Sequence, residues 1–189
     1  LDAAQAVPIA ADQRILHTLA QDYIIDKQEG VRQPLGMGGL FFGFVILISL
    51  PSIIPVAGFL IALALVPAGT VGIMAGAEQV QAGRFPTPAL LFVALRQGAA
   101  QARAILLLGA LYAAAIVAAI AASALVDGGQ FAQLYFGHAE LTQELASDPA
   151  FRGAMWVTLL LYLPISVAFW HAPALVHWHA VPPLKSIFF

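Results

Sequence analysis

The stretch LGMGGLFFGFVILISLPSIIPVAGFLIALALVPAGTVGIMAGA, residues 35–77, decides the fold because it holds no charged residue. One crossing of a bilayer needs about 20 apolar residues at a rise of about 1.5 Å each, and this stretch is roughly twice that long. Pro51 and Pro55 lie at its middle, where proline favours a turn. The stretch therefore predicts a transmembrane hairpin with spans over residues 35–50 and 56–76.

The composition of the whole chain supports a membrane protein. Of its 189 residues, 61% are hydrophobic and 10% are charged, whereas soluble domains are about 25% charged. A net charge of −2 does not favour nucleic acid as a partner, and a chain without cysteine has no disulfide or thiolate metal site. We predict an all-α integral membrane bundle whose first partner is the lipid bilayer.

Two further apolar stretches, residues 104–126 and 154–177, complete four predicted transmembrane helices. Trp156 and Trp178 lie about 33 Å apart along the last of them, which matches the aromatic belts at the two faces of a bilayer. The spans belong to one membrane domain over residues 35–189, in which short helices at the membrane interface join them.

The two ends of the sequence differ from this domain. Residues 1–34 are a polar segment, where apolar residues at helical spacing predict an amphipathic helix over residues 11–28. The last residues resemble the start of another apolar helix, so we expect the natural chain to continue beyond Phe189. Whether residues precede Leu1 stays open.

Basic residues predict the orientation, because Lys and Arg are enriched in cytoplasmic loops. Seven of the eight precede the first span, join the second and third spans, or follow the fourth; Arg152 alone lies on the other side. We therefore predict a multi-pass protein of the bacterial inner membrane with a cytoplasmic N-terminus. Arg84, Arg96 and Arg103 are expected to meet anionic lipid headgroups, with the last two on one helix face.

Small residues four apart predict helix packing, since they let backbones approach closely in lipid. Two G-x-x-x-G pairs and one alanine stripe have this spacing: Gly39 and Gly43, Gly72 and Gly76, and Ala110, Ala114, Ala118 and Ala122. We interpret all of them as packing surfaces, with no particular oligomer implied.

Three histidines, His171, His177 and His179, are the densest set of chemically capable side chains. His171 is expected about 10 Å inside the membrane, where an ionisable group is costly and suggests function. The favoured interpretation is a neutral His171 hydrogen-bonded to a neighbouring helix, with the other two solvated at the interface. A metal or tetrapyrrole ligand and a proton relay are the alternatives, so the cofactor stays open.

A polar stripe of Thr158, Tyr162 and Ser166 recurs on the fourth span, and Tyr162 is a ligand candidate. Packing is the favoured role, since Ser and Thr can bond the carbonyls of their own helix. Asp127 and Glu140 are expected to be solvated in an acidic loop. No G-x-S-x-G, H-E-x-x-H or phosphate-binding loop occurs, so no enzyme is predicted.

Four stretches carry a family resemblance: RQPL at residues 32–35, ALVDGG at 124–129, FWHAPALV at 169–176 and PPLKSIFF at 182–189. They resemble a family of uncharacterised multi-spanning inner-membrane proteins of proteobacteria, usually labelled hypothetical transmembrane proteins. The resemblance covers about residues 31–189 and implies a helical membrane protein that continues into a further span. It implies no activity, because none is established for the family. The family tends to have an entry helix with Arg and Trp, from which the acidic residues 1–30 depart.

Three hypotheses of function follow. The leading one is non-enzymatic: a scaffold or accessory subunit of a larger inner-membrane complex, packing against other membrane protein subunits through its Gly and Ala faces. The second is a small-solute transporter or channel, which needs a polar cavity at mid-membrane. The third is a subunit that binds a tetrapyrrole or metal through His171. The sequence names neither the partner or ligand nor the oligomeric state.

Overall fold

A computed structural model of the chain describes residue 21, residues 34–137 and residues 139–188. Within this part of the chain the regular structure is helical, and no strand occurs. The expected all-α class is confirmed. The amphipathic helix predicted over residues 11–28 lies outside the described residues, except for residue 21, which is helical.

Among the residues that the structure describes, four helices are long and apolar enough to cross a membrane: Pro34–Ile53, α2 (Ala57–Gln81), α4 (Ala99–Asp127) and α7 (Pro149–His179). They agree with the predicted helical membrane bundle. Each is longer than its predicted span, because the helices continue through polar residues such as Glu78, Arg103 and Arg152.

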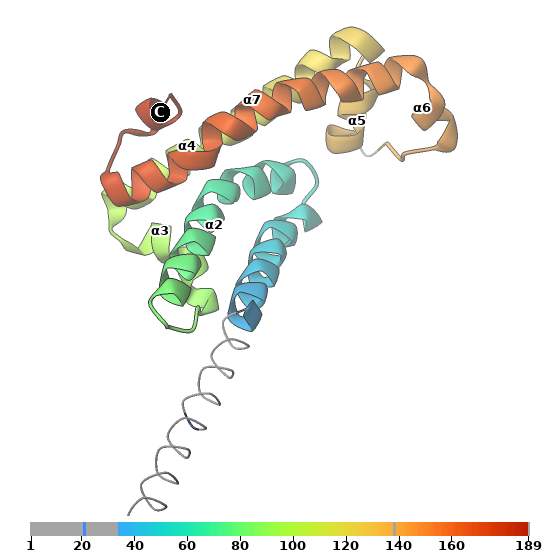
Figure 1. Ribbon diagram of the computed structural model, residues 1–189. Coiled ribbons are helices and arrows are strands. Elements are labelled where there is room, and N and C mark those ends of the chain that lie inside the picture. Colours follow the sequence, from blue (N-terminus) through green and yellow to red (C-terminus); the bar gives the residue numbers. More distant parts are fainter. Residues whose placement is uncertain (1–20, 22–33, 138, 189) are drawn as a thin grey trace, which may run out of the picture.

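Five short helical elements follow or join the long ones: η2 (Pro88–Phe92), α3 (Val93–Arg96), α5 (Gln130–Phe136), α6 (Gln143–Ser147) and α8 (Pro183–Ser186). Figure 1 shows α4 and α7 side by side along most of their length, with α2 crossing this pair and the Pro34–Ile53 helix outside α2. The core therefore lies where α2, α4 and α7 meet.

The predicted hairpin turn is present between the first helix and α2. A single 3-10 turn, η1 (Leu50–Ile53), ends the first helix. The Ala57 N–H then donates to the Pro55 carbonyl at 2.5 Å, across Val56 at φ 57° and ψ −61°. This is a γ-turn, which is uncommon for a β-branched residue.

The crossing of α2 over α4 depends on Gly109, which the sequence analysis did not select. A Cβ on this residue would lie 2.0 Å from the carbonyl oxygen of Ala64 in α2. Close approach of this kind maximises van der Waals contact in lipid. Around the crossing, a buried cluster joins Ala68 and Val71 of α2 with residues of α4 and α7, among them Ile105, Leu108 and Val176.

The loop between α4 and α7 packs back onto the bundle, which the sequence analysis did not foresee. Phe131 of α5 contacts Phe151 with 5.7 Å between ring centroids. Phe136 meets Phe59 of α2 edge to face, also at 5.7 Å. The hairpin turn and α5 therefore lie at the same end of the bundle (Figure 1).

Asp127 explains why the chain turns there, and its expected solvation is wrong. Its side chain is 6% exposed. One carboxylate oxygen accepts from the Gly129 N–H at 2.8 Å and the other from the Phe131 N–H at 2.6 Å. Gly128, at φ 68°, ends α4 in the left-handed conformation that glycine favours. The Asp127 carboxylate thus accepts from two backbone N–H groups at the start of α5, where the N-cap residue itself is Gly129.

The close approach of Gly109 to Ala64 leads to a testable prediction about helix packing. Gly109→Ala is expected to lower the free energy of unfolding by about 1–3 kcal/mol, because the new methyl group has to push α2 away. The measurement is loss of far-UV circular dichroism on titrating the detergent-solubilised protein with dodecyl sulfate. Gly38→Ala is the control, since a Cβ there meets nothing within 4 Å. Equal stability of the two variants would contradict the packing.

The hydrogen bonds of the Asp127 carboxylate lead to a second testable prediction. Asp127→Ala is expected to cost about 0.5–2 kcal/mol, concentrated in α5, because two backbone N–H groups lose their acceptor. Amide hydrogen exchange followed by mass spectrometry should show faster exchange over α5. Glu140→Ala, in the same loop but exposed, should leave that exchange unchanged. Unaltered protection of α5 in Asp127→Ala would refute the capping role.

Candidate functional site

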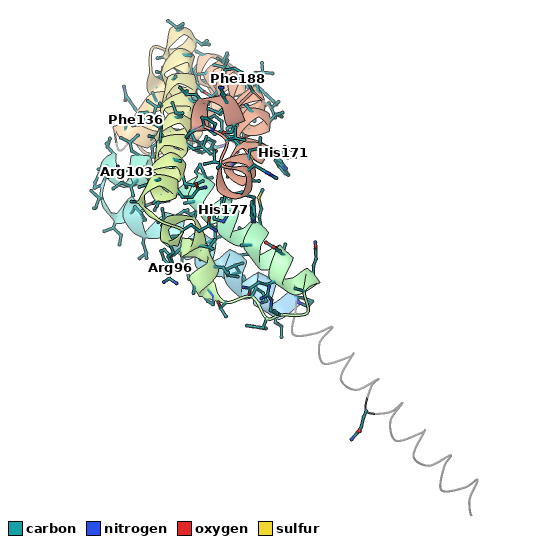
Figure 2. The ribbon with its side chains drawn as sticks, turned by 90° about the vertical axis from the view of Figure 1, so that its left-hand side faces the viewer. Arg96, Arg103, Phe136, His171, His177 and Phe188 are labelled. Atoms are coloured by element: carbon teal, nitrogen blue, oxygen red, sulfur yellow. The ribbon has the colours of Figure 1, made fainter. Side chains whose placement is uncertain are left out.

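The histidines of α7 point in different directions. His171 is exposed on the outer surface of the bundle, whereas His177 is 7% exposed and faces the interior. Figure 2 shows this difference, with His171 at the outer edge and His177 between the ribbons. The interpretation of His171 as an interior residue bonded to a neighbouring helix is wrong, and so is the solvated interface position of His177. His179 is exposed at the end of α7.

His177 belongs to a polar cluster that joins the end of α7 to the start of α4. Its Nε2 lies 3.1 Å from the side-chain nitrogen of Gln97, in the bend between α3 and α4. Gln101 donates to the carbonyl of Val176. The Nδ1 atom of His177 is buried and has no partner among the described residues. These contacts hold the end of α7 against α4, and sequence spacing gave no sign of them because Gln97 is 80 positions away.

The three histidines of α7 lack, within the described part of the chain, the companions that a metal site needs. No group of three or more His, Cys, Asp or Glu side chains within the described residues could hold an ion. His171 stands beside Trp170, which is 68% exposed. A ligand on His171 would therefore be held from the lipid side of α7.

The predicted alanine stripe lies on the open face of α4. Ala110, Ala114 and Ala118 are exposed and Ala122 is half-buried. The buried face carries other residues, including Gly109, Ala113 and Ile116. A hollow of about 460 Å³ runs between the stripe and α2; its lining is apolar and comprises Leu60, Ile61, Ala64, Ala110, Ala113, Ala114 and Val117. No helix among the described residues covers it.

The predicted glycine pairs differ in their surroundings. A Cβ on Gly72 would lie 2.6 Å from the Cα of Leu91 in η2, and one on Gly76 would meet the side chain of Leu40 at 2.3 Å. A Cβ on Gly43 would lie 3.2 Å from the side chain of Leu91, whereas a Cβ on Gly39 would meet nothing within 4 Å. Gly72 and Gly76 therefore lie at close approaches, and Gly39 does not.

The three arginines are exposed: Arg84 and Arg96 lie in the connection between α2 and α4, and Arg103 lies near the start of α4. Arg96 ends α3, and its guanidinium carbon lies 6.0 Å from the centroid of the Phe92 ring. Gly98, at φ 114°, separates α3 from α4. Arg96 and Arg103 are thus on two helices rather than on one face, which corrects the expectation; Figure 2 shows both at the surface.

The hydroxyl stripe of α7 divides between two cavities. Thr158 donates to the carbonyl of Ala154 at 3.0 Å, as expected for a back-bonded residue. The Ser166 hydroxyl is buried and has no partner among the described residues. It lines a cavity of about 340 Å³ between α2, α4 and α7, together with Thr70, Tyr112 and Tyr162. Tyr162 also lines a neighbouring cavity of about 290 Å³.

Comparison with known proteins supports the membrane domain. The chain is 37% identical over 161 residues to a probable inner membrane protein of Burkholderia thailandensis. This match covers 84% of the chain, and the chain spans about 60% of the length of that relative. The expected resemblance to uncharacterised proteobacterial inner-membrane proteins is confirmed: this is an inner membrane protein with several apolar helices, in contact with lipid. No solved structure matches.

The front of the chain is similar to a different protein. Residues 1–47 match the family described as the SHS2 domain inserted in FtsA. Over 40 residues the chain is 80% identical to the cell division protein FtsA of Pseudomonas aeruginosa and 52% identical to that of Neisseria meningitidis. Each match covers 21% of this chain and 10% of the relative. The RQPL stretch at residues 32–35, which we assigned to the membrane family, lies within the FtsA-like stretch.

The two similarities overlap. A match over 84% of the chain necessarily reaches into residues 1–47. The departure of the acidic residues 1–30 from the membrane family therefore has a simple reason, because this segment resembles FtsA. Sequence reasoning missed that similarity, since a short amphipathic pattern carries no family identity.

The two α7 histidines form a matched pair for mutation. His177→Ala is expected to lower the free energy of unfolding by about 1–3 kcal/mol, because Gln97 loses its buried partner. His171→Ala, on the same helix but exposed, should change it by less than about 0.5 kcal/mol. Thermal unfolding in mild detergent measures both. A larger effect at His171 than at His177 would contradict the arrangement of α7.

Proposed function

We propose that this inner membrane protein is a non-enzymatic scaffold or accessory subunit of a larger membrane assembly. The alanine stripe of α4 and the adjoining hollow against α2 would receive a helix of another subunit. The observation that carries the proposal is the position of the stripe: it lies beside a hollow lined by apolar residues, and no described helix covers it.

The physical case rests on what drives association in lipid. Lipid tails are as apolar as leucine, so helices associate through close packing and hydrogen bonds rather than through removal of water. Methyl-sized side chains such as Ala110 and Ala114 let a second backbone come near, and the hollow of about 460 Å³ can accept a bulky side chain from it. A rigid helix whose shape is complementary to the alanine stripe and the hollow makes more van der Waals contacts there than mobile acyl chains do.

The orientation of the assembly follows from its basic residues. Arg84 and Arg96 lie between α2 and α4, Arg103 lies near the start of α4, and Lys185 lies in α8 after α7, so all four belong to one end of the bundle. Arg152, in the first turn of α7, belongs to the other end. We infer that the end with four basic residues, together with the N-terminus, faces the cytoplasm.

The alternatives find less support. A solute path would need its polar groups in one line, yet Thr158 bonds its own helix and His171 faces outward. A tetrapyrrole on His171 would lie outside the bundle. The FtsA relatives are named as cell division proteins, but the similarity covers a tenth of them. Such a fragment does not carry a role in division to this chain.

Site-specific photo-crosslinking tests the proposed face. A benzophenone amino acid placed at Ala114 in the native membrane is expected to give a discrete protein adduct on irradiation. The matched control is Leu160 of α7, which is 64% exposed and should give lipid adducts only. A crosslinker at Ala118 should give a protein adduct as well. Ala114→Leu in that chain should remove this adduct, because the leucine side chain fills the hollow.

The outcome that refutes the proposal is equally definite. Lipid adducts alone at Ala114 and Ala118, with the same pattern as at Leu160, would show that acyl chains cover this face. A protein adduct of equal yield at Leu160 would show that crosslinking reports proximity of abundant membrane proteins rather than a specific surface.

A further inference from the structure

A cavity lined by hydroxyl groups lies between α2, α4 and α7. α7 packs along α4 over most of its length but meets α2 over a short stretch only. α2 and α7 therefore diverge from each other (Figure 1). The space between them is the cavity of about 340 Å³. This volume falls in the range of ligand pockets, about 300–1,000 Å³.

The polar groups of this cavity come from all three helices. Thr70 belongs to α2, Tyr112 to α4, and Tyr162 and Ser166 to α7. The Thr70 hydroxyl donates to the carbonyl of Val66 at 2.8 Å, which leaves its oxygen free to accept. The Ser166 hydroxyl is buried with no partner among the described residues. A buried hydroxyl without a partner is unfavourable, so a ligand oxygen that accepts a hydrogen bond from it would remove that cost.

The remaining walls are flat and apolar. Phe169 stands edge to face on Tyr112, with 5.2 Å between ring centroids and 63° between ring planes. Trp170 lies at the rim, and α2 adds aliphatic side chains and Met74. Aromatic walls with a few placed hydroxyls suit a planar ring that carries oxygen atoms.

A second cavity lies next to the first along α7. It has a volume of about 290 Å³ and shares Tyr162 with the first. Its other walls are mostly apolar and include Phe59, Ile120, Phe131 and Met155. This extension has the character of a channel for a hydrocarbon chain attached to the ring.

Depth in the membrane restricts the ligand further. Tyr162 and Ser166 lie near the middle of α7, and Thr70 and Tyr112 lie near the middle of α2 and α4. Among the described residues that line the two cavities, none is charged. A charged headgroup at this depth would lack a counter-charge, which is costly in hydrocarbon. A ligand of this cavity would therefore have to be neutral and would enter from the lipid.

We propose that Thr70, Tyr112, Tyr162 and Ser166 form a binding site for a neutral prenyl lipid with an oxygen-bearing ring, the class of isoprenoid quinones. The ring occupies the hydroxyl-lined cavity, with a ring oxygen bonded to Ser166, and the prenyl chain passes Tyr162 into the second cavity. The site is separate from the alanine stripe, so it does not depend on the proposed partner helix.

Tryptophan quenching tests the site directly. The full chain carrying Trp156→Phe and Trp178→Phe keeps Trp170 as its single reporter, at the rim of the cavity. Decylubiquinone added to this protein in phosphatidylcholine nanodiscs should quench the fluorescence saturably, at one quinone per chain. Ser166→Ala combined with Tyr112→Phe should raise the dissociation constant about tenfold.

The control hydroxyl is Ser123. It is buried on α4 like Tyr112, but it donates to the Ile120 carbonyl at 2.6 Å and does not line either cavity. Ser123→Ala should bind the quinone as the parent does. Ile73→Phe narrows the cavity without removing a hydroxyl and should abolish the saturable quenching by the quinone. This variant replaces the double variant in the test if the latter does not give a monodisperse, helical protein.

Three results would overturn the site. Quenching that grows in proportion to the quinone content of the bilayer, without saturation, would show collision in the lipid. Equal affinity of the double variant and the Ser123→Ala control would show that the hydroxyls do not bind the ring. Displacement of the quinone by dodecanol at equal concentration would show that the cavity selects a chain and not a ring.

Discussion

Backbone hydrogen bonding without water is the constraint on which this structure depends. Inside a bilayer each peptide N–H and C=O needs a partner from the protein, and only continuous helices supply one within a single segment. The apolar runs of this chain therefore become four long helices, and the chain turns outside them with its own caps. Asp127 and Asp148 accept from backbone N–H groups at two such turns. Helix contacts then depend on close packing, as where Gly109 meets Ala64.

Length and hydropathy were sufficient to predict the long apolar helices and the turn between the first two, because a helix satisfies its own backbone hydrogen bonds in a solvent that offers none. They were not sufficient to predict which side of a helix faces its neighbours. α4 is apolar all round, so the stripe at Ala110, Ala114 and Ala118 could not be distinguished from the buried face at Gly109 and Ala113. Only the direction of α2 across α4 decides this, and it comes from contacts distant in the sequence.

For the polar residues of α7, too, the sequence did not predict which side of the helix faces its neighbours. His171 and His177 are equally conspicuous in the sequence, yet one faces lipid and the other faces Gln97. The hydroxyl stripe was recognised by its spacing, whereas the cavity beside Ser166 needs Thr70 and Tyr112 from other helices. The FtsA-like front of the chain adds a different lesson: residues 1–47 resemble a second protein, and no periodicity within them indicates this.

The central claim is that lipid, not water, surrounds the long helices, and cysteine labelling tests it most directly because these 189 residues contain no cysteine. Val167 of α7 and Leu141 of the loop before it are 74% and 63% exposed on the protein surface. In vesicles opened by freeze–thaw, a membrane-impermeant maleimide should label Leu141→Cys rapidly and Val167→Cys hardly at all, although the protein covers neither. Labelling of Val167→Cys at the rate of Leu141→Cys would show water at the middle of α7 and contradict the membrane topology together with the roles drawn from it.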